Sequence, residues 1–177
     1  MNEEKELEKI YLKIDKEYLE IVSFILNNTE FQRRKEYHHH ENRSVYLHSL
    51  MVSYKSYKIA KKLKLDYRSA AIGGLLHDFY YNDWQTNPKK VKKITEMHGF
   101  VHPKEALENS KKLFPNIIDN KISDIISKHM FPLTIKPPRY LESWIITMVD
   151  KYVSLEIFKT PTQLLKYIGI RKSDENE

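Results

Sequence analysis

The spacing of apolar residues constrains this chain more than any other feature. From residue 4 to residue 27, large apolar side chains recur every three or four positions, with Lys and Glu between them. The same spacing returns in most later segments, and the 177 residues include only 4 Gly and 7 Pro. Because Gly and Pro interrupt helices, the pattern predicts an all-α protein. The length fits one compact domain with a single core.

Within this single domain, 1–177, we expect three parts. Residues 1–36 would form an N-terminal helix and connector, residues 37–158 the helical core, and residues 159–177 a C-terminal helix and a frayed tail. The predicted helices cover residues 4–27, 45–65, 67–79, 89–97, 103–114, 116–130 and 140–158, with a short one after Pro161. The sequence contains no internal repeat.

Local signals predict where several helices begin. Ser44 and Asp66 precede periodic segments, and their side chains can accept hydrogen bonds from a first helical turn. The pair His102-Pro103 is typical of an N-cap followed by the first helical residue, with Gly99 ending the preceding helix. Residues 28–43 and the Pro-rich segment 131–140 are predicted to be irregular.

Small residues are concentrated in the helix predicted over residues 67–79. Ala70, Ala71, Gly73 and Gly74 lie within five positions. Their short side chains would allow another helix to approach closely.

The composition limits the possible partners and compartments. There is no Cys, which excludes disulfides and thiolate metal sites and suits a cytoplasmic protein. No apolar run approaches the ~20 residues of a membrane span, and the charged N-terminus does not resemble a signal peptide. The net charge of +6 favours anionic partners, although lysines that keep helix surfaces soluble would give the same value. No DNA- or RNA-binding motif is present, so we expect a small phosphorylated substrate rather than a nucleic acid or a membrane.

Six polar residues stand in predicted helices or at helix ends, in apolar surroundings. A buried carboxylate is costly unless it is paired, and a single buried His is usually satisfied by a backbone carbonyl. Six such residues on different helices are more simply explained by convergence on a cation. The residues are His48, His77, Asp78, His102, His129 and Asp150.

This set contains more ligands than a four-coordinate structural zinc site needs. Four imidazoles and two carboxylates match two metals bridged by one carboxylate and a hydroxide, with positions left open for chemistry. In this arrangement His77 would bind one metal and Asp78 would span both. Oxygen and nitrogen ligands favour Fe or Mn, with Ni, Co or Zn as substitutes.

These residues carry a family resemblance. The segments "SVYLHSLMVSYKSYKIA", "GGLLHDF", "HGFVHP", "SKHMFP" and "MVDKYVSL" resemble the HD-domain superfamily of metal-dependent phosphohydrolases. The likeness spans residues 37–158 and points to the subset with two extra histidines between the His-Asp pair and the last Asp. That family has an all-α fold of five or more helices. The chain lacks the Gly-Tyr-Pro signature of the cyclic-dinucleotide phosphodiesterase branch.

The resemblance implies a ligand assignment and a reaction. One metal would be held by His48, His77, Asp78 and Asp150, and the second by Asp78, His102 and His129. The second site has fewer protein ligands, so it should bind its metal more weakly. A metal-activated hydroxide would cleave a phosphate ester or anhydride of a nucleotide-like substrate.

Five further residues are candidates for contact with substrate. Lys151 follows a predicted ligand and could bind phosphate, or could instead be a solvated lysine on another face of its helix. Lys55 lies two helical turns after His48 and could face the same pocket. His40 could touch substrate or act as a general acid. Asp83 and Trp84 could line the mouth of the pocket.

Two other functional classes fit the same sequence. An oxygenase with a diiron centre could use the same four His and two Asp to cleave a C–C or C–P bond, and the ligand list does not separate it from a hydrolase. A non-catalytic helical protein could bind nucleic acid through the basic run Lys89–Lys93. The sequence leaves the exact substrate and the oligomeric state open.

Overall fold

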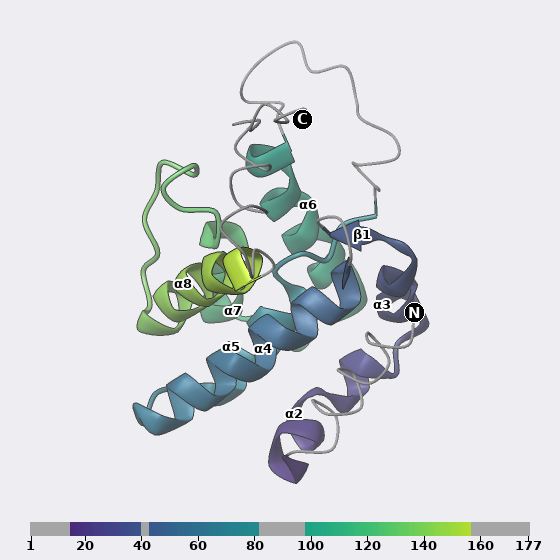
Figure 1. The fold of residues 1–177 in the computed structure, drawn as a ribbon, viewed down its shortest axis with the longest axis horizontal. Helices are drawn as coiled ribbons and strands as arrows, with labels where there is room; N and C mark the ends of the chain where they lie inside the picture. Colours follow the sequence, from purple (N-terminus) through teal and green to yellow (C-terminus); the bar gives the residue numbers. More distant parts are fainter. Residues whose placement is uncertain (1–14, 40–42, 82–97, 157–177) are drawn as a thin grey trace, which may run out of the picture.

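The computed structural model describes residues 15–39, 43–81 and 98–156, and the described elements are almost entirely helical (Figure 1). The prediction of an all-α fold is confirmed. The helices are α2 (Lys16–Leu26), α3 (Thr29–Gln32), α4 (Val45–Lys62), α5 (Tyr67–Leu76), α6 (His98–Leu113), α7 (Asn120–Lys128) and α8 (Leu141–Glu156). Within the described ranges, none of these helices has the length and hydropathy needed to cross a bilayer.

Helices α4 and α5 form the centre of the fold. Helix α8 packs against both, and α7 packs against α5, α6 and α8 (Figure 1). The cap predictions at both central helices are confirmed. The Ser44 side chain accepts a hydrogen bond from the first turn of α4, and the Asp66 side chain does the same for α5.

The small residues of α5 allow it to lie very close to α4. The Ser53 hydroxyl of α4 donates to the Ala71 carbonyl at 2.6 Å. A Cβ atom added to Gly74 would lie 2.6 Å from Ser53 Cα, well inside van der Waals contact. The prediction that this segment permits close helix approach is confirmed, and Gly74 is the position where only glycine fits.

An ion-pair cluster joins the N-terminal ends of α5, α7 and α8. Lys121 Nζ lies 3.1 Å from Asp66 Oδ2 and 3.2 Å from Glu142 Oε1. The same Glu142 oxygen accepts from the Asp66 backbone N–H at 2.9 Å. Burial alone would raise the pKa of the Asp66 carboxyl, but hydrogen bonds from Ser69 and Lys121 outweigh burial and lower it.

The prediction that residues 28–43 are irregular is wrong for the described residues, 28–39 and 43. Asn28 caps the short helix α3, whose Phe31 is fully buried. A 3-10 turn, η1 (Arg33–Glu36), follows, and β1 (His38–His39) pairs antiparallel with β2 (Arg43–Ser44). Each element is too short to show periodic apolar spacing in the sequence. Phe31 and Arg34 are fully buried and anchor α3 and η1 to the core.

The predicted helix start at His102-Pro103 is also wrong. Helix α6 begins at His98, so Gly99 lies in its first turn and Pro103 in its interior. Proline removes one helical hydrogen bond, but His102 just before it and Ala106 in the next turn are both buried, and this burial favours the helical conformation.

Other predicted boundaries differ by a few residues. Helix α4 ends at Lys62 rather than residue 65, because Lys64 adopts a left-handed conformation with φ of 57°. Helix α5 ends at Leu76, three residues early, and α7 begins at Asn120, where the Asp119 side chain caps it. The helix predicted over 89–97, the one after Pro161 and the first part of the helix predicted over 4–27 lie outside the described residues.

Candidate metal centre

Five helices bring the six predicted ligands together in the interior. His48 lies in the first turn of α4, His102 in α6 and Asp150 in α8. His77 caps the C-terminus of α5, with Asp78 following it, and His129 caps the C-terminus of α7. None of the six is more than 8% exposed.

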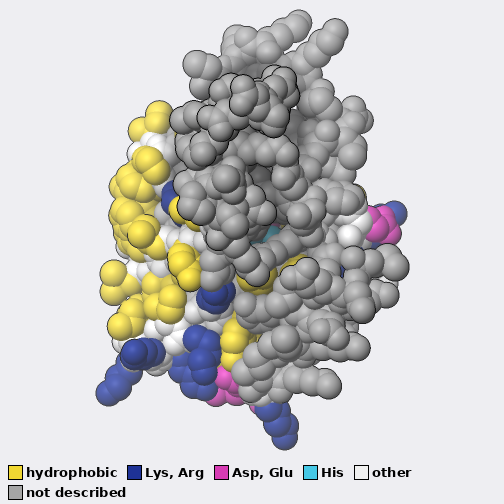
Figure 2. All heavy atoms as spheres, viewed as in Figure 1, with side chains coloured by type: hydrophobic (Ala, Val, Ile, Leu, Met, Phe, Trp, Pro, Cys, Tyr) yellow, Lys and Arg dark blue, Asp and Glu magenta, His cyan; other side chains and the backbone are white. Residues whose placement is uncertain are grey.

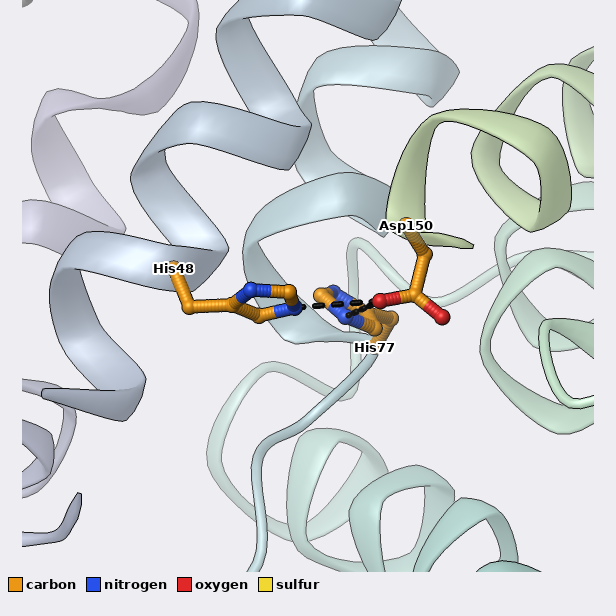
Figure 3. Close-up of side chains that lie close together, drawn as sticks. All are labelled: His48, His77 and Asp150. Carbon is orange, nitrogen blue, oxygen red and sulfur yellow. Dashed lines mark hydrogen bonds and ion pairs between the residues drawn. The ribbon is translucent and has the colours of Figure 1, made fainter. Parts of the chain in front are cut away.

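The first group of donors consists of His48, His77 and Asp150 (Figure 3). Both imidazoles point toward the Asp150 carboxylate. His48 Nε2 lies 3.0 Å from Asp150 Oδ1, and His77 Nε2 lies 3.5 Å from the same oxygen. One donor atom from each residue fits within 4.8 Å of the others, so one cation could contact all three.

The second group consists of Asp78, His102 and His129. The Nε2 atoms of the two imidazoles are 2.8 Å apart. Asp78 Oδ1 lies 3.3 Å from His102 Nε2 and 3.6 Å from His129 Nε2. These three side chains therefore direct their donor atoms at one point, as the first group does.

Asp78 lies between the two groups and presents one oxygen to each. Its Oδ1 faces the second group, while its Oδ2 lies 3.4 Å from His77 Nε2 and 3.8 Å from His48 Nε2. A carboxylate in this position could contact two cations at once.

Helix ends orient two of the imidazoles. His77 Nδ1 donates to the Gly74 carbonyl at 2.8 Å, and His129 Nδ1 donates to the Ile126 carbonyl at 2.8 Å. In both cases the acceptor is a carbonyl of the last helical turn, which lacks an intrahelical partner. Because Nδ1 carries a proton, Nε2 is left as the atom that can bind a metal.

The charges of the cluster differ between its two halves. Burial lowers the pKa of His77, but the charges of Asp78 and Asp150 outweigh burial and raise it to about 9. Burial and the neighbouring His102 and His77 lower the pKa of His129 to about 3, so His129 is neutral at physiological pH. Burial would raise the pKa of Asp150, but hydrogen bonds from His48 and His77 hold it well below its usual value.

Two side chains of α6 hydrogen-bond to the backbone that follows Asp78. The sequence analysis did not predict these contacts. Asn109 Nδ2 donates to the Phe79 carbonyl at 2.9 Å, and Glu105 Oε1 accepts from the Tyr81 backbone N–H at 3.0 Å. Glu105 and Asn109 lie three and seven residues after His102, so the three share one helix face. This spacing is the one sequence feature that could have indicated the contacts. It is not specific, because polar residues at this spacing are common on any helix surface.

The structure also locates two of the predicted substrate contacts. Lys151 is half-buried, and its Nζ donates to the carbonyls of His129 at 3.3 Å and Thr147 at 3.2 Å. Burial lowers the pKa of Lys151, and the charge of Asp150 partly offsets this. The Lys55 ammonium lies 5.0 Å from the centre of the Tyr152 ring.

The Lys151 ammonium therefore contacts the backbone of His129 and is not fully solvated. Contact of Lys151 or Lys55 with phosphate stays a prediction. His40, Asp83, Trp84 and the basic run Lys89–Lys93 lie outside the described residues.

The chemistry of the donors fits divalent metals. Each group offers two imidazole nitrogens and a carboxylate oxygen, and all are buried. Such donors suit Fe, Mn, Co, Ni and Zn, and each group leaves positions for other ligands. The buried His/Asp clusters could therefore bind metals.

Comparison with known proteins adds one match. The family model described as the HD domain matches residues 45–155, which contain all six clustered residues. No curated protein and no solved structure matches the chain.

Proposed function

Because the chain belongs to the HD-domain family, a superfamily of metal-dependent hydrolases, we propose that it is a phosphohydrolase with a two-metal centre. Its substrate would be a phosphate ester or anhydride of a nucleotide-like compound. The observation that supports two metals is the position of Asp78, which presents Oδ2 to one pair of imidazoles and Oδ1 to the other.

We assign the ligands as the sequence suggested. His48, His77, Asp78 and Asp150 would hold one cation, and Asp78, His102 and His129 the other. Mn²⁺ or Fe²⁺ would be the native metal, with Ni²⁺, Co²⁺ or Zn²⁺ able to substitute. The second cation would have three protein ligands instead of four, so it should exchange more readily.

The protein's own residues would prepare the site for this reaction. When bound, the two cations would lower the pKa of a water molecule and offset charge on the phosphoryl oxygens. The hydrogen bonds from His77 and His129 to helix-end carbonyls fix both rings, so Nε2 of each would be available to a cation without further reorganisation. Burial of all six ligands strengthens their electrostatic interactions. The net charge of +6 would favour approach of an anionic substrate. A cytoplasmic location stays a prediction.

The decisive experiment separates hydrolysis from oxidation. Protein purified without chelators would be loaded with Mn²⁺ and incubated in an anaerobic cuvette with nucleotide phosphate esters and anhydrides. We expect release of phosphate or of a nucleotide without oxygen consumption. Activity that depended strictly on iron and dioxygen would refute hydrolysis and would leave the ligand assignment intact.

Two variants test the ligand roles. Asp78→Ala should remove both metals and all activity, because this carboxylate belongs to both proposed coordination shells. His129→Ala should lose mainly the second metal. Glu108→Ala is the control, since the Glu108 side chain is 65% exposed and lies outside the cluster. Full metal content in both cluster variants would show the assignment to be wrong.

A further inference from the structure

The outer face of α8 carries a stripe of exposed apolar side chains. Figure 2 shows hydrophobic side chains gathered along the left edge of the molecule, where Figure 1 places α8 and the loop before it. We call the five α8 residues the α8 stripe. They are Leu141 (63% exposed), Trp144 (38%), Met148 (63%), Tyr152 (55%) and Leu155 (59%).

The α8 stripe is large enough to support an interface. With about 200 Å² for each large side chain, its exposed area is on the order of 500 Å² per chain. Two such faces together reach the lower limit of about 1,000 Å² for a specific protein–protein contact. Leu133 and Ile135, in the loop before α8, are 48% and 90% exposed and could extend the contact.

The spacing of the stripe is symmetric. Counted from Met148, the other members lie four residues away on each side and then seven residues away on each side. Two copies of α8 laid antiparallel about a two-fold axis at Met148 would therefore match residue for residue. Trp144 of one copy would face Tyr152 of the other, and Leu141 would face Leu155, as an isologous interface requires.

We propose that this face is a homodimer interface in which α8 packs antiparallel against α8 of a second copy of the chain. None of the five stripe residues is charged, which suits an apolar partner of the same kind. The Lys55 ammonium, 5.0 Å from the centre of the Tyr152 ring, borders the stripe at Tyr152. Lys151, on the same helix, directs its ammonium inward to the His129 and Thr147 carbonyls and so does not interrupt the stripe.

The first test measures dissociation of the dimer. Sedimentation analysis of the metal-loaded protein should show a concentration-dependent monomer–dimer equilibrium. Met148→Lys would place two ammonium groups on the two-fold axis and should weaken the dimer at least tenfold. Phe24→Lys is the matched control, because Phe24 is 40% exposed on α2, a helix that Figure 1 shows well apart from α8, and it should leave the dimer unchanged. A protein that stays monomeric at all concentrations would overturn the proposal.

The register can be tested by cross-linking, since the chain contains no Cys. Met148→Cys should form a disulfide-linked dimer under mild oxidation with diamide, because the two thiols would meet on the axis. Tyr152→Cys alone should not form this dimer. In the antiparallel pairing, position 152 of the second chain would lie eight residues away along the helix, about 12 Å, which is too far for a disulfide. A mixture of the Tyr152→Cys and Trp144→Cys proteins should cross-link. Efficient self-linking of Tyr152→Cys with no linking of the mixture would indicate a parallel pairing and refute the antiparallel one.

Discussion

Replacing Gly74 with Ala sets two physical effects against each other, and the structure decides which one dominates. Ala is a better helix former than Gly by about 1 kcal/mol, so the substitution would stabilise α5 if the space around it were open. The space is closed, because the new Cβ would lie 2.6 Å from Ser53 Cα and 3.1 Å from Ser53 N. Both atoms belong to the backbone of α4, so no side chain can rotate to relieve the contact.

The expected result is a net loss of stability. Overpacking typically costs about 1–3 kcal/mol, and contacts with backbone atoms place this case at about 2–3 kcal/mol. After the gain in helix propensity of about 1 kcal/mol, about 1–2 kcal/mol of destabilisation should remain. For a chain of this size the loss corresponds to a Tm lower by about 2–8 °C. Because the Gly74 carbonyl also accepts from His77 Nδ1, a shift of α5 should weaken Mn²⁺ binding as well.

The assay is thermal unfolding of the metal-free variant, followed by Mn²⁺ titration. Gly73→Ala supplies the contrast, because its Cβ would meet the Ile125 side chain, with Cγ2 at 2.5 Å. Adding Ile125→Ala should therefore recover part of the loss caused by Gly73→Ala, beyond the sum of the two single changes. Ser53→Ala should not rescue Gly74→Ala. A Tm for Gly74→Ala above that of the wild type would refute the close approach of the two backbones.

Three other outcomes follow from the contacts. Mn²⁺ binding at pH 7 should release protons, because burial lowers the pKa of His77 but the neighbouring carboxylates raise it to about 9, and a metal must displace that proton. Calorimetry in buffers of different ionisation enthalpy measures the release, which should fade above pH 9. Asn109→Ala should weaken binding of the second metal at a stability cost of about 1 kcal/mol, while the exposed control Asn116→Ala should do neither. Lys121→Met should cost about 1 kcal/mol at pH 7 by denaturant titration. The pKa of the Asp66 carboxyl is lowered, so the stability that it contributes is present above its unfolded pKa and declines as pH falls. The difference between Lys121→Met and wild type should therefore shrink in acid, and a constant difference would contradict the ion pair.

Sequence patterns predicted the features that repeat or that are chemically unusual. Apolar spacing revealed the long helices, and polar residues in apolar surroundings revealed the six clustered side chains, all of which the fold brings together. Features set by tertiary contacts were missed. Helix α6 continues through Pro103, and Ala106 in the turn after the proline is buried. The residues near Pro103 in the sequence do not indicate that burial.

The sequence also did not indicate the direction in which individual side chains point. The sequence could not distinguish a Lys151 that faces solvent from one that reaches the His129 carbonyl, because that acceptor is 22 residues away on another helix. The symmetric α8 stripe is visible in the sequence only after the structure shows which residues are exposed. Every side chain of a helix points outward from the helix axis, and tertiary packing determines whether it contacts solvent or the core.

The separation of the clustered residues along the chain has a consequence for folding. His48 and Asp150 are 102 positions apart, and the chain has no Cys with which to join distant segments covalently. Cations bound at the two groups would tie α4, α5, α6, α7 and α8 together as non-covalent cross-links. A disulfide persists in the unfolded chain and restricts it, whereas these cross-links would exist only in the folded chain and would stabilise it by binding that state. They would also be reversible, since their strength depends on the concentration of free metal. The thermal stability of this protein would then report the metal supply around it.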